Sequence, residues 1–165
     1  MDDEIRKMKD TLSALREYQE KADHIVSYAE NHTPCGFSWN EMNCRGCLHK
    51  ADCDESRERS VHTAWNMRMR ALREYSRLEE KARKMLKESG KTAAGSVDSV
   101  ELQVLLAKVL RNLADNDLIL GEDSGARFRE AEQLFLELYY QTGSPGYKEE
   151  AESCRLLAMR RQGSR

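Results

Sequence analysis

The feature that most constrains the fold is a heptad pattern over residues 2–31. Hydrophobic residues recur there at spacings that alternate between three and four, with one polar interruption at Gln19. Such a repeat is typical of an amphipathic helix whose apolar seam packs against another helix. The seam consists of Ile5, Met8, Leu12, Leu15, Gln19, Ala22, Val26 and Ala29, and Tyr18 and Ile25 widen it. We expect the helix to end before Thr33-Pro34, because a residue that precedes proline is disfavoured in the helical conformation.

A second amphipathic pattern runs from about Ser56 to Glu88. Its apolar face consists of Val61, Trp65, Leu72, Tyr75, Ala82 and Leu86, with Met69 beside them. Two long amphipathic helices joined by a compact loop predict an antiparallel helical hairpin over residues 1–91. The seam of the first helix could instead pair between two chains, which would make the protein a homodimer.

The remainder of the chain predicts a small three-helix module over residues 97–165, after a linker at 91–96. Twelve of the 24 residues from 97 to 120 are Val, Ile or Leu, as expected of a helix at the centre of a bundle. Two shorter amphipathic patterns follow, on either side of Gly143. Their inner faces consist of Phe128, Ala131, Phe135 and Leu138, and of Tyr147, Ala151, Cys154 and Leu157 or Ala158. With only 2 Pro and 9 Gly, the chain is predicted to be all-α.

Four of the five cysteines lie within 19 residues, in the loop at 32–56 that joins the two long helices. They are Cys35, Cys44, Cys47 and Cys53, in the pattern C-x8-C-x2-C-x5-C. Four thiolates fill a tetrahedral shell, and the C-x2-C step lets two of them bind one ion. Without a secretion signal, such clustering favours a metal over disulfides. The sequence therefore predicts a metal site with four cysteine ligands at the tip of the hairpin, with Zn as the first choice of ion.

A 4Fe–4S cluster is the alternative cofactor, since it also takes four thiolates and tolerates irregular spacing. The last three cysteines, with a fourth upstream, resemble the iron–sulfur staple of RecB-like nucleases. That resemblance covers about 19 residues, and no nuclease pattern of carboxylates and lysine accompanies it. His32 and His49 are close enough in sequence to replace a cysteine in a zinc site.

The ion could have either of two roles. It could simply stabilise a loop that has little apolar content of its own, since metal binding supplies folding free energy. Alternatively, the tip could be a contact surface on which Phe37 and Trp39 are displayed. We favour the stabilising role.

The second helix also carries a basic face, because residues 57–91 have a net charge of +6 in a chain whose total is −2. The members of this face lie opposite its apolar stripe and include Arg70, Arg73, Arg77, Lys81 and Lys84. Such a row could bind the phosphates of a nucleic acid or an acidic partner. Long surface helices also commonly expose Lys and Arg to solvent, and this plainer interpretation is preferred.

No residues qualify for a catalytic or cofactor-binding role, so an enzyme is not expected. The chain begins with acidic residues rather than a basic signal sequence, and its most apolar stretch carries six charges. We therefore expect a cytoplasmic protein without membrane association. The favoured function is a non-enzymatic, metal-stabilised helical module that binds a protein partner as an adaptor, regulator or inhibitor. The alternatives are a nucleic-acid-associated protein that uses the basic face and an iron–sulfur redox sensor.

Overall fold

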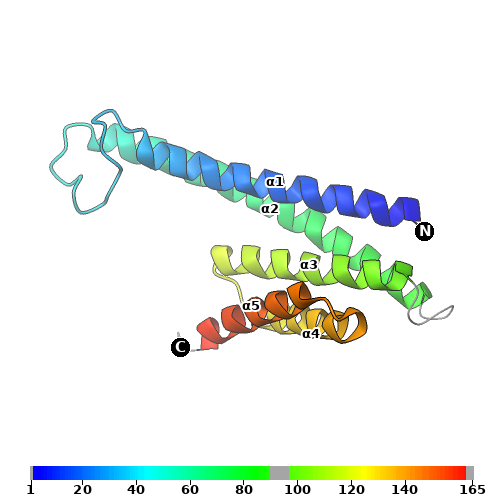
Figure 1. The fold of residues 1–165 in the computed structure, drawn as a ribbon. Coiled ribbons are helices and arrows are strands. Elements are labelled where there is room, and N and C mark those ends of the chain that lie inside the picture. The colour runs from blue at the N-terminus through cyan, green and yellow to red at the C-terminus, as the bar shows by residue number, and fades with distance from the viewer. Residues whose placement is uncertain (1, 90–96, 163–165) are drawn as a thin grey trace. The chain divides into compact units, whose positions relative to one another are not determined.

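The computed structural model describes residues 2–89 and 97–162, and within them it contains helices and no strand (Figure 1). The five helices are α1 (Asp2–Asn31), α2 (Lys50–Ser89), α3 (Val97–Leu120), α4 (Gly125–Thr142) and α5 (Pro145–Gln162). The predicted all-α architecture, with two long helices followed by a small helical module, is therefore confirmed. The predicted linker at 91–96 lies outside the described residues.

The chain forms two compact units, and both long helices contribute to each. One unit comprises Ala14–Ala71, which includes the loop between α1 and α2. The other comprises Met1–Ser13 and Leu72–Arg165, and so contains α3, α4 and α5. None of the helices in the described part of the chain is long and apolar enough to cross a membrane.

Ion pairs establish the antiparallel arrangement of α1 and α2. In the Ala14–Ala71 unit, Arg57 pairs with Glu30 at 3.0 Å and Arg68 pairs with Asp23. The partner's number falls along α1 as the residue number rises along α2, which is the register of an antiparallel hairpin. Figure 1 shows the connecting loop at one end of this helix pair.

The heptad seam predicted for α1 lies on its inner face. Ile5, Met8, Leu12 and Ala22 are buried, and Leu15, Gln19, Val26 and Ala29 are half-buried. Because the single chain already covers this seam, a homodimer that uses it would require the hairpin to open. The homodimer stays a prediction.

The apolar face predicted for α2 is wrong over its first half. Val61 and Trp65 are exposed, whereas Tyr75 and Ala82 are buried as predicted. Inward positions recur at spacings of three and four and are occupied by Ala64, Arg68, Ala71, Tyr75, Leu78, Ala82 and Met85. Alanine occupies three of these positions, and Arg68 finds a carboxylate partner in α1. A search for large apolar side chains overlooks such a seam.

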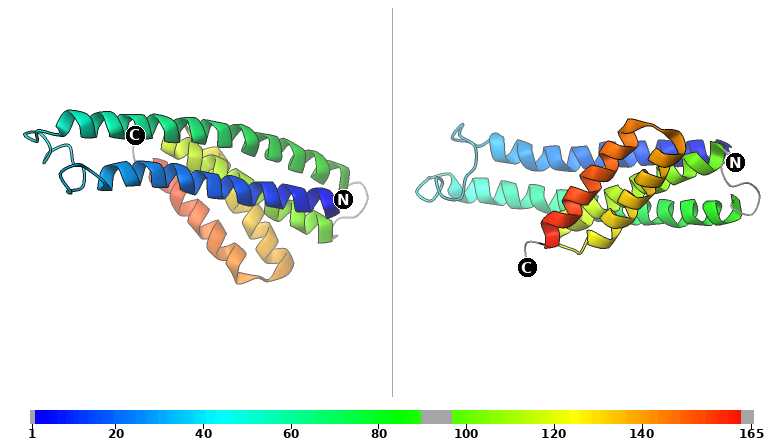
Figure 2. Two further views of the ribbon diagram at one scale, coloured as in Figure 1. Left: turned by 90° about the horizontal axis from the view of Figure 1, so that it is seen from above. Right: turned by 60° about the horizontal axis from the view of Figure 1, so that its bottom comes forward.

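The three-helix module is built around α3, as its composition predicts. α3 buries eight aliphatic or alanine residues, and α4 buries Phe128, Ala131, Phe135 and Leu138. Figure 2 shows α4 and α5 as a helical hairpin beside α3. Gly143 ends α4 with φ +70°, a left-handed conformation that favours glycine, and its N–H donates to the Tyr139 carbonyl at 2.8 Å.

Candidate metal centre

The tip loop, residues 32–49, joins the end of α1 to the start of α2 and is shorter than predicted. Helix α2 begins at Lys50 rather than near Ser56. Cys53 therefore lies on the helix, where its N–H donates to the His49 carbonyl at 3.0 Å, and not in the loop. The helix begins early because an acidic residue, Asp52, falls in its first turn, where a negative charge stabilises the helix dipole.

Cys35 lies in a tight turn at the start of the tip loop. The Gly36 N–H donates to the Thr33 carbonyl at 3.0 Å, and Gly36 has φ +75°, which a residue with a side chain rarely adopts. The Thr33 hydroxyl lies 3.3 Å from the Cys35 sulfur. The pKa of Cys35 is lowered by this hydrogen bond first and by the Phe37 backbone N–H second. Both contacts favour the thiolate, which is the form that binds a metal.

Cys44 and Cys47 form a second turn. The Cys44 N–H donates to the Asn40 carbonyl at 2.9 Å, and the Cys47 N–H donates to the Cys44 carbonyl at 3.1 Å. The Asn40 N–H points back at the Cys44 sulfur, 3.5 Å away. The Asn40 side chain also accepts hydrogen bonds from the Met42 and Asn43 N–H groups. The C-x2-C segment is thus shaped by backbone hydrogen bonds, as a chelating turn requires.

Cys53 brings the four thiols into one neighbourhood. It is only 6% exposed, whereas Cys35, Cys44 and Cys47 are half-buried. Burial raises the pKa of Cys53, and the charges of Cys35, Cys47 and Cys44 raise it further. All four predicted ligand residues are free thiols, and none of them is in a disulfide.

The four thiols are neighbours rather than a closed coordination sphere. Over residues 2–89 and 97–162, no three His, Cys, Asp or Glu side chains are arranged as they would be around a metal ion. The ring of His32 is stacked on Tyr28 with 3.8 Å between ring centroids, and its Nδ1 lies 3.0 Å from the Tyr28 carbonyl oxygen. His49 is exposed. Zinc and the 4Fe–4S cluster both stay predictions.

Trp39 is not displayed as the contact-surface alternative of the sequence analysis would have it. It is half-buried, with its backbone N–H donating to the Glu30 carbonyl at 2.7 Å and its indole N–H donating to Asp54 at 2.9 Å. The Arg57 guanidinium lies 4.1 Å from the centre of its ring. We call Glu30, Trp39, Asp54 and Arg57 the Trp39 cluster. One sequence signal could have indicated this cluster. It is a single tryptophan inside the cysteine-rich loop, with charged residues on both sides of the loop.

Other apolar side chains of the tip loop are exposed, as was expected of Phe37. Phe37 and Met42 are each 78% exposed, and Leu48 is 98% exposed. Large apolar side chains with this degree of exposure are common in contact surfaces of proteins.

The predicted basic face does consist of exposed residues. Arg70 belongs to the Ala14–Ala71 unit, whereas Arg73, Arg77, Lys81 and Lys84 belong to the other. Arg77 pairs with Glu74 at 2.5 Å, and Lys81 pairs with Glu4 at 3.1 Å. Arg70, Arg73 and Lys84 have no ion pair within the described part of the chain.

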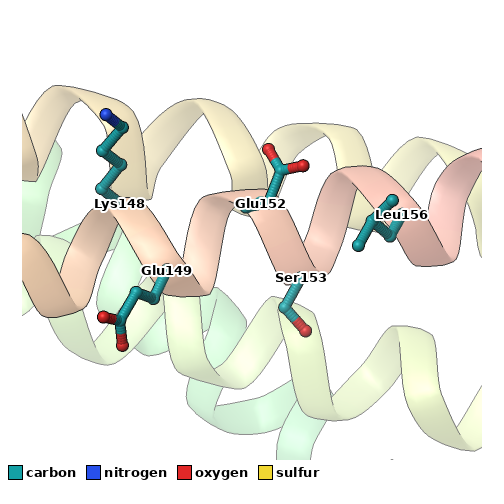
Figure 3. Close-up of a pocket in the computed structure, with 5 residues that line it drawn as sticks. All are labelled: Lys148, Glu149, Glu152, Ser153 and Leu156. Atoms are coloured by element: carbon teal, nitrogen blue, oxygen red, sulfur yellow. The ribbon is translucent and has the colours of Figure 1, made fainter.

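Two further features, a buried cysteine and a hollow on α5, do not form a reactive site. Cys154 is fully buried, and burial raises its pKa to about 11, so it is an inert core thiol as predicted. A shallow hollow of about 510 Å³ on α5 is lined by Lys148, Glu149, Glu152, Ser153 and Leu156 (Figure 3). These side chains fan out along one helix and do not converge on a common point.

No protein-family model, curated protein or solved structure matches this chain. The resemblance of its cysteine spacing to an iron–sulfur staple therefore remains confined to the tip.

Proposed function

We propose that this chain is a non-enzymatic, metal-stabilised helical module that binds a protein partner in the cytoplasm through its tip loop. Cys35, Cys44, Cys47 and Cys53 would hold one structural zinc ion. The observation that carries the proposal is the clustering of four free cysteines in the tip loop and the first turn of α2, with Cys53 buried. An adaptor, a regulator and an inhibitor would all use such a module.

The C-x2-C step favours a single ion over a cluster. Zn–S bonds of about 2.3 Å in a tetrahedron put the sulfur atoms about 3.8 Å apart. The turn from Cys44 to Cys47 is a C-x2-C step, which suits two ligands of one ion. A 4Fe–4S cluster would hold its four cysteine sulfurs farther apart, because four irons lie between them. An iron–sulfur sensor therefore comes second.

The exposed side chains of the tip loop support protein binding. Phe37, Met42 and Leu48 lie in the same segment as three of the ligands. An ion that restrains this loop would hold them ready for a partner, and a restrained surface loses less conformational entropy on binding.

Metal analysis and a visible spectrum of anaerobically purified protein test the proposal. We expect about one zinc per chain and no visible band, and we expect Cys44→Ser with Cys47→Ser to abolish zinc binding. About four irons per chain with a brown chromophore would favour the iron–sulfur sensor. Protein that holds neither metal would contradict both functions. Substituting serine for Phe37, Met42 and Leu48 should remove partner capture and leave the metal content unchanged.

A second candidate function is binding of a nucleic-acid backbone, which is favoured by the exposed and unpaired charges of Arg70, Arg73 and Lys84 within the described residues. Glutamate at Arg73, Arg77 and Lys81 should then remove binding to DNA or RNA and flatten its dependence on salt. Wild-type protein that shows no salt-sensitive retention on either nucleic acid would exclude this function.

A further inference from the structure

The Trp39 cluster joins three consecutive segments of the chain. Glu30 belongs to the last turn of α1, Trp39 to the tip loop, and Asp54 and Arg57 to the first turns of α2. The cluster closes on itself, because Arg57 contacts the Trp39 ring and also donates from Nε to Glu30 at 3.0 Å. Lys50 adds an ion pair to Asp54. All of these residues belong to the Ala14–Ala71 unit.

This cluster acts on two of the four cysteines through short connections. Asp54 directly follows Cys53, and Trp39 comes four residues after Cys35. The indole-to-carboxylate hydrogen bond therefore holds the Cys35 turn close to the first turns of α2. Cys44 and Cys47 lie beyond Trp39, where local turns supply the hydrogen bonds of the backbone.

We propose that Trp39 is a positioning residue for the metal centre, which holds Cys35 near Cys53 before any ion is bound. The site would then be half-formed by the protein alone, and the turn from Cys44 to Cys47 would close onto the ion. This inference rests on the proposed function, since it assumes that the four thiols bind a metal. A pre-positioned pair of ligands raises metal affinity because part of the ordering entropy is already spent.

The inference is tested by titrating metal-free protein with Co²⁺, whose tetrahedral thiolate complexes absorb in the visible range, and then displacing it with Zn²⁺. Loss of a residue that orients metal ligands typically weakens metal binding by about 10- to 100-fold. We expect Trp39→Ala to fall in this range. Trp39→Phe should bind with an intermediate affinity, because it keeps a ring against Arg57 but loses the N–H that bonds Asp54.

Phe37→Ala is the matched control, because it removes an aromatic ring from the same loop but from an exposed position. We expect it to bind Co²⁺ as the wild type does. Circular dichroism of each variant must show wild-type helix content, so that a change in affinity is not one of folding. Equal affinities for Trp39→Ala and wild type would overturn the inference, as would equal losses in Trp39→Ala and Phe37→Ala.

The two proposals fail in different ways. Wild-type protein that gives no Co²⁺ complex contradicts the metal centre itself, whereas normal affinity in Trp39→Ala contradicts only the role of Trp39. A second measurement uses metal-free protein carrying Trp65→Phe, which leaves Trp39 as the only tryptophan. Its fluorescence should resist quenching by acrylamide, and Asp54→Ala should remove that protection. Equal quenching of the two would overturn the inference.

Discussion

The tip of the hairpin and the three-helix module are built from the same kind of helix but are stabilised by different interactions. The module buries Phe128, Phe135 and the leucines of α3 completely. The tip leaves Phe37, Met42 and Leu48 exposed and is organised by an indole, two carboxylates, a guanidinium and cysteine thiols. The comparison indicates that apolar burial explains the module, whereas the tip depends on polar contacts.

The same contrast appears in the helix pair α1 and α2. Near the tip, the inward residues of α2 are Ala64, Arg68 and Ala71, which offer little apolar surface. Burial lowers the pKa of Arg68, whose guanidinium pairs with Asp23. Each fully buried large apolar side chain contributes about 1.5–3 kcal/mol, so a segment that lacks them depends more on specific polar contacts.

The same substitution in the two regions should give the largest difference. Phe135→Ala removes a fully buried ring from the module and should lower the free energy of unfolding by about 3–5 kcal/mol. Phe37→Ala removes an exposed ring from the tip loop and should change it by less than about 0.5 kcal/mol. Urea denaturation followed by circular dichroism measures both. Similar losses in the two variants would contradict the comparison.

A smaller effect should separate the regions at high pH. Burial raises the pKa of Cys154 from 9.0 to about 11, so the module favours the neutral thiol. This contribution to stability is complete below pH 9.0 and is lost as the pH rises to about 11. Each pKa unit corresponds to about 1.4 kcal/mol, which partial screening by solvent reduces to a total of about 1–2 kcal/mol. Urea midpoints from pH 8 to 11 should fall less steeply in Cys154→Ala than in wild type. Parallel plots of midpoint against pH for the two proteins would contradict a contribution from Cys154.

The smallest effect is expected at low pH and at the tip. The pKa of Asp54 is lowered from 3.8 by its contact with Lys50 first and by the Trp39 indole second. The stability that the charged Asp54 carboxylate contributes is therefore present above pH 3.8. It is lost as the pH falls through the lower pKa that Asp54 has in the folded state. In the Trp65→Phe background, acrylamide should reach Trp39 more readily below that pH. The Asp54→Asn variant should lack this increase in quenching at low pH. An unchanged increase would show that a group other than Asp54 causes it.

Residue spacing predicted much of the fold and of the candidate site. The alternation of three and four identified the inner face of α1, the density of Val, Ile and Leu identified α3, and Gly143 marked the end of α4. These inferences about the fold succeeded because each depends on residues that are near one another along the chain. The metal site at Cys35, Cys44, Cys47 and Cys53 comes from the same kind of local pattern and stays a prediction.

The errors concerned one helix boundary and the contacts between different segments. The start of α2 was placed too late, so Cys53 was assigned to the loop. Trp65 was assigned to a core that is lined by alanine at that level, and the partner of Trp39 was not identified. A tryptophan in a loop has no periodic pattern that would reveal its partner 15 residues later.

The sequence by itself determined the helices, the apolar faces of α1, α3 and α4 and the clustering of four cysteines near the junction of the two long helices. These features follow from helical periodicity and turn chemistry, which are local properties. Only the tertiary structure decided that α2 turns Ala64, Arg68 and Ala71 inward and that Trp39 joins α1 to α2. Those choices depend on which residues of one helix meet which residues of the other. The alignment of α1 with α2 is set by the packing and ion pairing of both helices together, so it cannot be derived from either helix alone.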